Sequence, residues 1–204
     1  MVSEVVEQQI RAAFDRGDLE LAASTAVTCY RSEIYSFLCA RLGTESDAHE
    51  VLGQVNEDLW RGLPTFRWQC SFRTWLYTLA RHAAVRHERL VAHQPKRRRG
   101  LSSLPEIAMR DRSRTRPYLR TDVKDRFAEL RATLSRDEQT LLVLRLDREL
   151  SWLAVAHVLH DGHEPDETTL EREAANLRQR YRSLKRRLIA QARQAGLVDD
   201  EPPP

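Results

Sequence analysis

Two arginines and a tyrosine recur every four residues in the stretch from Arg67 to Arg89, which reads RWQCSFRTWLYTLARHAAVRHER. Arg73, Tyr77 and Arg81 fall on one stripe of an expected helix, because residues four apart share a helix face. Arginine neutralises phosphate, and an aromatic ring offers a stacking surface to an unpaired base. An exposed stripe of this kind suits melted nucleic acid. The residue types fit equally well a basic surface helix that tryptophan packs against its neighbours.

Helices on the N-terminal side of this stretch must position it. Apolar residues at helical spacing predict a short helix over 5–14, a longer one from Asp18 to Gly43, and a third that Thr44 caps and that ends around 62–64. Their expected buried faces are continued in the Arg67–Arg89 stretch by Phe72, Trp75, Leu76, Leu79 and Ala83. Short connections between helices of this length predict a compact antiparallel bundle.

The apolar pattern stops after Arg89. Residues 92–121 contain prolines, serines and the run Lys96-Arg97-Arg98-Arg99, and nine basic residues stand against two acidic ones between 95 and 120. This composition predicts a flexible, strongly basic linker. Two interpretations stay open: a solvated connection whose charge is incidental, and a segment threaded along a nucleic-acid or polymerase channel.

A second helical domain is expected over 122–197. Ser135 and Glu138 form the signature of a capping box before a leucine-rich helix, and Ser151 caps a short helix that ends near Leu159. After a turn at 160–166, a second capping box over 168–171 is expected to start a long helix that runs to about Ala195. A short helix, a turn and a long helix with a basic face form a helix-turn-helix pattern, whose second helix reads DNA in the major groove. An ordinary helical hairpin with an arginine-rich last helix is the alternative.

The expected fold class is therefore all-α, with two helical domains, an N-terminal helical bundle and a C-terminal helix-turn-helix, joined by a flexible basic linker. The bundle covers 1–91, the linker 92–121, the second domain 122–197 and a disordered tail 198–204. Acidic residues gather between 42 and 60, where no lysine or arginine occurs, and basic residues gather in the linker and the last helix. This segregation suits two kinds of partner, a polyanion and a positively charged protein surface.

Several classes of function find no support in the chain. Cys29, Cys39 and Cys70 are widely spaced, which indicates reduced thiols and neither a disulfide framework nor a metal site. His157, His160 and His163 follow at intervals of three without a further ligand of known spacing, so a polar turn is the favoured interpretation. No phosphate-binding glycine loop or nucleophile motif is present, and we expect no catalytic residue, metal or cofactor. The absence of a signal peptide or an apolar span predicts a cytoplasmic protein.

Two segments of the chain resemble the small two-domain bacterial sigma factors, called the extracytoplasmic-function group. The run DAHEVLGQVNEDLWRGLPTF over 47–66 resembles the family segment DAEDVVQEVFLRLWRGLPRF, and SFRTWLYTLARH over 71–82 resembles SFRTWLYRIARN. The segments 134–146, 150–159 and 176–188 resemble the family's promoter-reading domain less closely. The resemblance covers roughly residues 15–195.

The resemblance implies a protein without catalytic activity that binds core RNA polymerase and gives it promoter specificity at initiation. The helix over 47–61 would then dock on the polymerase, and the residues implied there are Asp47, Glu50, Gln54, Glu57, Asp58 and Trp60. The loop and helix over 67–89 would recognise and melt the −10 element, with Arg67, Trp68, Gln69, Cys70, Ser71, Arg73, Trp75, Tyr77, Arg81 and His82. The helix-turn-helix would read the −35 element through Thr168, Thr169, Arg172, Arg178, Arg182, Lys185 and Arg186. The implied partners are core RNA polymerase and promoter DNA, with an anti-sigma factor as a further candidate and no membrane insertion.

The chain departs from the family pattern at several positions. Trp68 stands where a glycine is usual, His82 where an asparagine is usual, and the linker is basic where related proteins often have acidic ones. The turn at 160–167 is also longer than the family's. Two other functions remain open: a helix-turn-helix regulator that acts without dependence on core polymerase, and a helical RNA-binding or adaptor protein.

Overall fold

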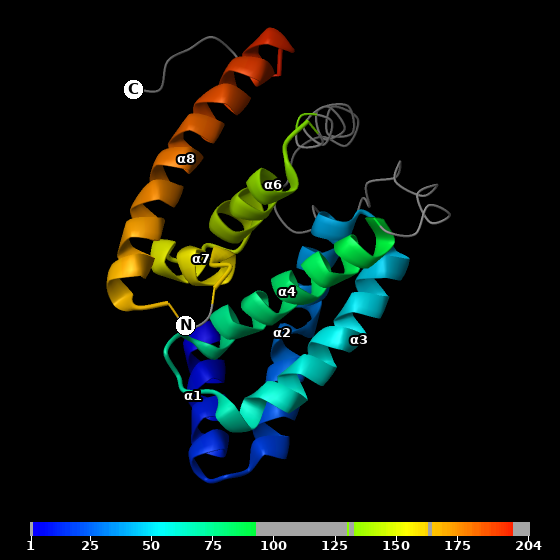
Figure 1. Ribbon diagram of the computed structural model, residues 1–204, viewed down its shortest axis with the longest axis vertical. Coiled ribbons are helices and arrows are strands. Elements are labelled where there is room, and N and C mark those ends of the chain that lie inside the picture. The colour runs from blue at the N-terminus through cyan, green and yellow to red at the C-terminus, as the bar shows by residue number, and fades with distance from the viewer. Residues whose placement is uncertain (1, 93–129, 131–132, 163–164, 198–204) are drawn as a thin grey trace.

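The computed structural model describes residues 2–92, 130, 133–162 and 165–197, and every regular element in these ranges is a helix (Figure 1). The all-α fold class is confirmed. The elements are α1 (Val2–Asp15), α2 (Leu19–Leu42), α3 (Glu45–Gly62), the 3₁₀ turn η1 (Leu63–Thr65), α4 (Phe72–Ala92), α6 (Arg136–Leu142), the π-helical segment η4 (Val143–Asp147), α7 (Trp152–Leu159) and α8 (Glu167–Gln194). None of these helices is long and apolar enough to cross a membrane.

Helices α1 to α4 form the predicted bundle. The limits of α2 and α3 lie where the sequence placed them, whereas α1 begins three residues before the predicted residue 5, at Val2. Asp18 caps α2 by accepting a hydrogen bond from the backbone N–H of Leu21, and Gly43 ends that helix with a φ of 80°. A left-handed backbone of this kind favours glycine, which has no Cβ to clash. Thr44 caps α3 through the N–H of Asp47. Local sequence therefore determines where these helices start and stop.

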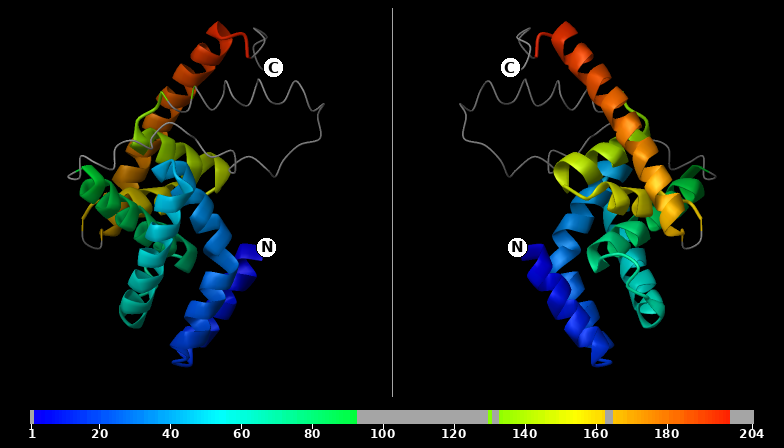
Figure 2. Two further views of the ribbon diagram at one scale, coloured as in Figure 1. Left: turned by 90° about the vertical axis from the view of Figure 1, so that its right-hand side faces the viewer. Right: turned by 90° about the vertical axis from the view of Figure 1, so that its left-hand side faces the viewer.

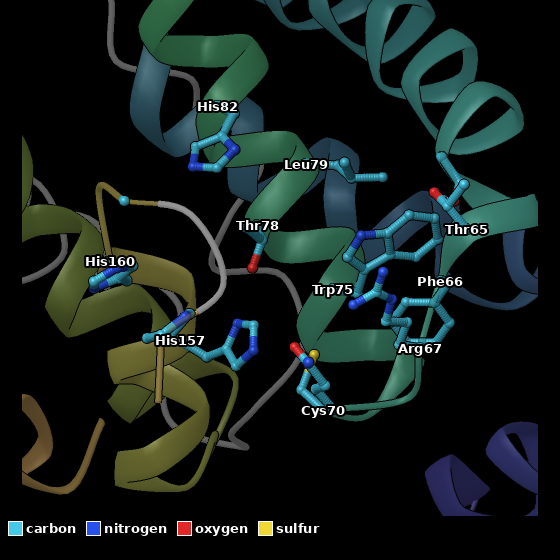
Figure 3. Close-up of a pocket in the computed structure, with 14 residues that line it drawn as sticks. Thr65, Phe66, Arg67, Cys70, Trp75, Thr78, Leu79, His82, His157 and His160 are labelled. Carbon is cyan, nitrogen blue, oxygen red and sulfur yellow. The ribbon is translucent and has the colours of Figure 1, made fainter. Parts of the chain in front are cut away.

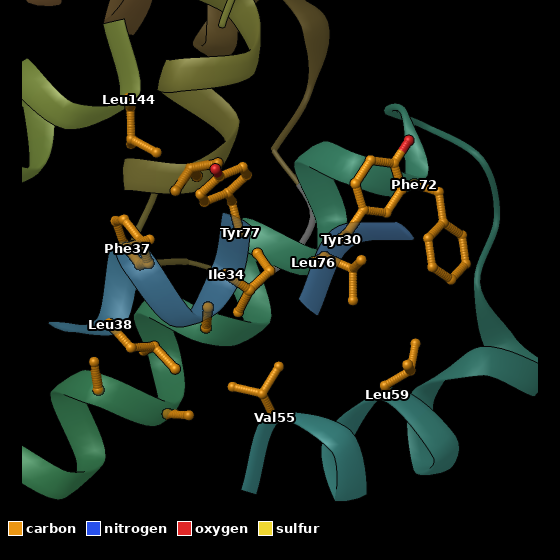
Figure 4. Packing of buried hydrophobic residues seen from close by; sticks show 14 of the residues in the cluster. Tyr30, Ile34, Phe37, Leu38, Val55, Leu59, Phe72, Leu76, Tyr77 and Leu144 are labelled. Atoms are coloured by element: carbon orange, nitrogen blue, oxygen red, sulfur yellow. The ribbon is translucent and has the colours of Figure 1, made fainter. Parts of the chain in front are cut away.

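The core of the bundle lies between α2, α3 and α4 (Figure 4). On α3, the apolar side faces the core through Ala48, Val51, Leu52, Val55 and Leu59, all of which are buried. On α4, Phe72, Leu76 and Ala83 are buried as predicted, whereas Trp75 and Leu79 are half-buried. The helix is therefore anchored through its apolar stripe, and Trp75 lies at the edge of the core.

The second part of the chain starts its helices mostly as predicted. Ser135 and Glu138 make the capping box, and Ser151 caps α7. The leucine-rich helix continues beyond α6 as the π-helical η4. The second capping box, expected from Thr168 to Glu171, is wrong: Asp166 caps α8 and accepts from the N–H of Thr169 at 2.7 Å. A carboxylate oxygen is a strong acceptor, and capping from Asp166 lets the helix begin directly after the turn.

The described portions of the two predicted domains pack against each other. Helix α7 lies on α4, and α6 contacts α2, so that residues from both parts belong to one buried cluster. Figure 2 shows α6 and α7 lying between the bundle and the long α8, which projects away from it. The proposed linker from 93 on, the start of the predicted second domain up to residue 129, and the tail from 198 on lie outside the described residues. The domain limits therefore remain predictions.

The core of the bundle gives a stability prediction at Leu59, whose side chain has 0% exposure. Leu59→Ala should lower the free energy of unfolding by about 2–5 kcal/mol, because it removes buried methyl groups and leaves a cavity. Urea denaturation followed by circular dichroism measures this loss. Leu90→Ala is the matched control, since Leu90 is 61% exposed and its truncation should change stability by less than about 0.5 kcal/mol. Equal effects of the two changes would contradict the described packing of α3.

Candidate nucleic-acid interface

The loop before α4 is built on a cluster of aromatic rings. Phe66 stacks on Trp75 with ring centroids 4.6 Å apart, and it meets the ring of Phe72 edge-on at 5.5 Å. Trp68 packs among Phe14, Phe66 and Phe72, and the guanidinium of Arg11 lies 4.5 Å from its ring centroid. Aromatic contacts of this geometry add to the free energy of burial, so the loop has a defined shape.

Trp68 has a left-handed backbone, with a φ of 57°. Few residues other than glycine adopt such values, because the Cβ crowds the following carbonyl group. The family pattern has a glycine at this position, and the backbone here has the conformation that glycine favours. The contacts of the indole with α1 and the loop offset the cost of that conformation. The ring of Trp68 consequently packs toward α1 and the loop.

A carboxylate from α1 holds the start of α4. Glu7 accepts hydrogen bonds from the backbone N–H groups of Phe72 and Arg73, each at 2.8 Å, and from the Tyr30 hydroxyl at 3.1 Å. The hydroxyl of Ser71 accepts from the N–H of Thr74 at 3.1 Å. Backbone N–H groups at a helix start lack partners within the helix, and a negative charge there is favourable. The loop and α4 are therefore fixed to α1 and to each other.

A cavity of about 320 Å³ lies between the loop, α4 and the second part of the chain (Figure 3). The loop and α4 contribute one wall, and α7 and the following turn contribute the other. The residues that line it are Gly62, Thr65, Phe66, Arg67, Gln69, Cys70, Trp75, Thr78, Leu79, His82, His157, His160, Gly162 and Pro165. Of the ten residues expected at the −10 element, five reach this cavity: Arg67, Gln69, Cys70, Trp75 and His82.

Two titratable groups on the α4 side of the cavity, Cys70 and His82, are uncharged near neutral pH, and the Arg67 guanidinium also lines the cavity. Burial raises the pKa of the Cys70 thiol to about 12, and the nearby Glu7 carboxylate adds to the rise. Burial lowers the pKa of the His82 imidazole, and the positive charges of Arg81 and Arg86 lower it further. A thiol and a neutral imidazole beside aromatic rings can donate and accept hydrogen bonds with an uncharged planar group. This part of the lining suits a nucleobase, whereas the Arg67 guanidinium on the loop suits a phosphate.

The stripe of Arg73, Tyr77 and Arg81 is not exposed, contrary to the expectation from the sequence. Tyr77 has 0% exposure and donates a hydrogen bond to Glu33 at 2.6 Å. Burial and the Glu33 charge raise the pKa of its hydroxyl well above the usual range. Arg73 forms an ion pair with the same carboxylate, and Arg81 has 6% exposure. The sequence pattern of one helix could not reveal that other helices cover this side.

Only some of the residues of the acidic helix α3 that were predicted to bind the polymerase are exposed to solvent. Glu50, Glu57 and Trp60 are exposed, and Trp60 keeps 49% of its surface. Asp58 forms ion pairs with Arg86 and Arg61, and Asp47 lies 3.3 Å from the imidazole of His87. The exposed set is therefore smaller than predicted, with Gln54 half-buried between the two faces.

The basic residues of α8 lie mainly in solvent. Thr169 is half-buried, and the other six residues expected at the −35 element are exposed: Thr168, Arg172, Arg178, Arg182, Lys185 and Arg186. On the opposite side, Leu177 and Leu184 are buried, and Tyr181 stacks edge-on against Trp152 of α7 with centroids 5.5 Å apart. The helix thus has an apolar side for α7 and a cationic side for a polyanion.

Comparison with known proteins agrees with this arrangement. Residues 26–90 match the family Sigma-70 region 2, which spans most of α2, all of α3 and most of α4. The chain is also similar to RNA polymerase sigma factor YlaC of Bacillus subtilis (strain 168), with 28% identity over 151 residues that cover 73% of this chain and 86% of that protein. Both similarities are to sigma factors, and they support the resemblance to the extracytoplasmic-function group. These similarities support a DNA-binding sigma factor that directs transcription initiation.

Sequence reasoning missed several residues that shape the site of this sigma factor. Glu7 and Glu33 bind the start and the arginine side of α4 from α1 and α2, and Asp161 pairs with Arg81 at 2.5 Å. No local signal marks these acids, because each is separated from its partner by at least 40 residues. Only the fold brings them to α4.

The histidines of the second part of the sigma factor show no metal centre in the part of the chain that the structure describes. No group of three or more potential ligands lies close enough together there. His160 pairs with Glu173 of α8 at 3.0 Å, which ties the turn to that helix. His163 lies outside the described residues.

Glu33 gives a prediction, because its carboxylate serves both Arg73 and Tyr77. Glu33→Gln should destabilise the sigma factor by about 1–3 kcal/mol, since it leaves Arg73 without its counter-charge while keeping the side-chain size. Thermal unfolding at neutral pH measures the change. Glu171→Gln is the control, because Glu171 is exposed on α8 and the same loss of charge should cost little there. A Glu33→Gln variant as stable as the control would contradict the described network.

Proposed function

We propose that this sigma factor binds core RNA polymerase through α3, recognises and helps to melt the −10 element through the loop and α4, and reads the −35 element through α8. The observation that carries this proposal is the cavity beside the aromatic loop, because it offers a thiol, a neutral imidazole and aromatic rings to an unpaired base. Base stacking on aromatic rings is worth about 1–3 kcal/mol per base.

The polymerase surface that we assign to α3 consists of Glu50, Glu57 and Trp60. Two exposed carboxylates around an exposed tryptophan suit a basic partner, since an aromatic anchor with a charged rim is typical of protein interfaces. Asp47 and Asp58 contribute indirectly to this surface, because they hold α3 on α4. Gln54 lies between the exposed residues and the paired ones.

The proposed function includes no catalytic step by the chain itself. No cofactor or metal is needed for promoter recognition, and the bond-forming chemistry belongs to the polymerase. An anti-sigma factor is a further partner to expect for a member of this group. Such a protein acts in the cytoplasm, where the chromosome and the polymerase are found.

Run-off transcription with purified core polymerase tests the proposal. We expect promoter-dependent transcripts only when both core polymerase and this chain are present, on promoters found by mapping transcription starts after overexpression. Specific promoter binding by the chain alone, without a promoter-dependent transcript when core polymerase is added, would instead identify a helix-turn-helix regulator. Binding to RNA without either activity would identify an adaptor.

Arg178 and Arg182 provide a test of the −35 assignment. Arg178→Ala and Arg182→Ala should each weaken promoter binding by the holoenzyme. If an arginine binds phosphate, the loss of affinity should be nearly equal for all promoter sequences. If it reads a base, the discrimination between bases at one promoter position should fall by about 1–3 kcal/mol. Competition binding on a set of single-base promoter variants separates these cases. Arg180→Ala is the control, because Arg180 lies on another side of α8. A loss of promoter affinity in this variant equal to that in the other two would contradict the −35 assignment.

A further inference from the structure

The loop before α4, residues 66–71, is held from α1, a helix that lies outside the residues 26–90 matched by Sigma-70 region 2. Glu7, Arg11 and Phe14 of α1 contact this loop or the first residues of α4. We infer that α1 positions the loop, with Glu7 as the main positioning residue, and thereby sets how tightly and how selectively the unpaired −10 strand binds. This inference rests on the proposed function of the loop and α4.

The Glu7 carboxylate completes the cap at the start of α4. The Ser71 hydroxyl accepts from the N–H of Thr74, and Glu7 serves the two amides before it. Its Oε2 accepts from the N–H of Phe72 and its Oε1 from the N–H of Arg73, each at 2.8 Å. Hydrogen bonds to an ionised acceptor are stronger than those between neutral groups, and a negative charge at a helix start is favourable. The position of α1 therefore fixes the first turn of α4.

Helix α1 is itself fixed on the bundle, so Glu7 has a defined place. Val6, Ile10 and Ala13 are buried in the core cluster that also contains residues of α2, and α1 packs along α2. Tyr30 of α2 donates from its hydroxyl to Oε1 of Glu7 at 3.1 Å, which restricts the carboxylate further. The same carboxylate thus joins three helices, α1, α2 and α4.

The loop itself is held to α1 through Trp68. The ring of Phe14 meets the Trp68 ring edge-on at 5.7 Å, and the guanidinium of Arg11 lies 4.5 Å from its centroid. The residues on either side of Trp68 are Arg67 and Gln69, which are exposed and line the cavity beside the loop. Since Trp68 stands between them in the chain, its attachment to α1 determines where these two side chains reach the cavity.

Loss of the Glu7 hydrogen bonds should affect recognition more than folding. Groups that recognise a ligand must be held within about 0.5 Å of the productive geometry by their neighbours. The apolar contacts of Val6, Ile10 and Ala13 keep α1 on the bundle without help from Glu7. Without the carboxylate, α1 therefore stays in place, whereas the start of α4 and the loop lose a restraint. The polymerase surface proposed on α3 does not include this contact.

Two substitutions of Glu7 test its role while leaving the proposed DNA-binding residues intact. Glu7→Ala removes both acceptor oxygens, and Glu7→Gln removes the charge but keeps one acceptor oxygen and the length of the side chain. Glu4→Ala is the matched control, because Glu4 is exposed on the same helix and carries the same charge. Circular dichroism and thermal unfolding establish that each full-length variant is folded, and Glu7→Gln alone serves if Glu7→Ala does not fold.

Three affinities separate positioning from general damage. They are the affinity of each variant for core polymerase, and those of the holoenzyme for a duplex with the −35 element and for single-stranded oligonucleotides with the −10 sequence of a mapped promoter or single-base changes in it. In Glu7→Ala we expect the −10 affinity and the preference for the native −10 bases each to fall about tenfold, because hydrogen bonds to a charged acceptor are lost.

The other measurements should change little. Affinities of Glu7→Ala for core polymerase and for the −35 duplex should stay within about twofold of the wild-type values, which is within ordinary variation for a surface change. Glu7→Gln should lie between Glu7→Ala and wild type in −10 affinity, since one acceptor remains. Glu4→Ala should match the wild-type protein in all three affinities.

The outcomes separate this inference from the proposed function. A −10 affinity and base preference in the folded Glu7 variants equal to those of Glu4→Ala would overturn the positioning role. Equal losses in all three affinities would also overturn it, because Glu7 would then serve the fold as a whole. If the wild-type holoenzyme shows no preference for a −10 sequence, the proposed function of the loop fails. Faster amide hydrogen exchange over 67–75 in Glu7→Ala would still show that Glu7 holds the loop.

Discussion

The Glu33 carboxylate is the interaction on which the arrangement around α4 depends. It accepts hydrogen bonds from the hydroxyl of Tyr77 and from the guanidinium of Arg73, and Arg73 also donates to the backbone carbonyl of Arg148. A half-buried charge is stable only when it is paired and hydrogen-bonded, so α2, α4 and the segment after η4 must meet at this point. One acid thus determines both how α4 sits on the bundle and how the second part of the chain sits on α4.

This network changes the meaning of the arginines on α4. On an exposed helix these arginines would be available to bind phosphate, but here Arg73 and Arg81 are already bound to oxygens of the protein. In the proposed function, phosphate oxygens of DNA replace these protein oxygens, and the exchange of one oxygen acceptor for another costs little when the contact is partly solvated.

The loop before α4 shows how a departure from the family pattern is accommodated. Trp68 takes the left-handed conformation that suits a glycine, and its ring packs with Phe14, Phe66 and Arg11. A large side chain at this point strengthens the attachment of the loop to α1. Cys70 and other neighbours form the walls of the cavity, so in the proposed function the preference for a −10 base depends on them more than on the tryptophan.

The sequence by itself determined the helices, their limits and the core of the bundle, because Thr44, Gly43 and the apolar spacing on α3 act through local geometry. It also identified the family, through motifs that lie along continuous segments. Tertiary structure alone decided which side of α4 is open, because the acids that bind it, Glu33 and Asp161, come from distant parts of the chain. Helix periodicity separates a polar face from an apolar one, but a polar face can be covered by any element that brings oxygens to its arginines.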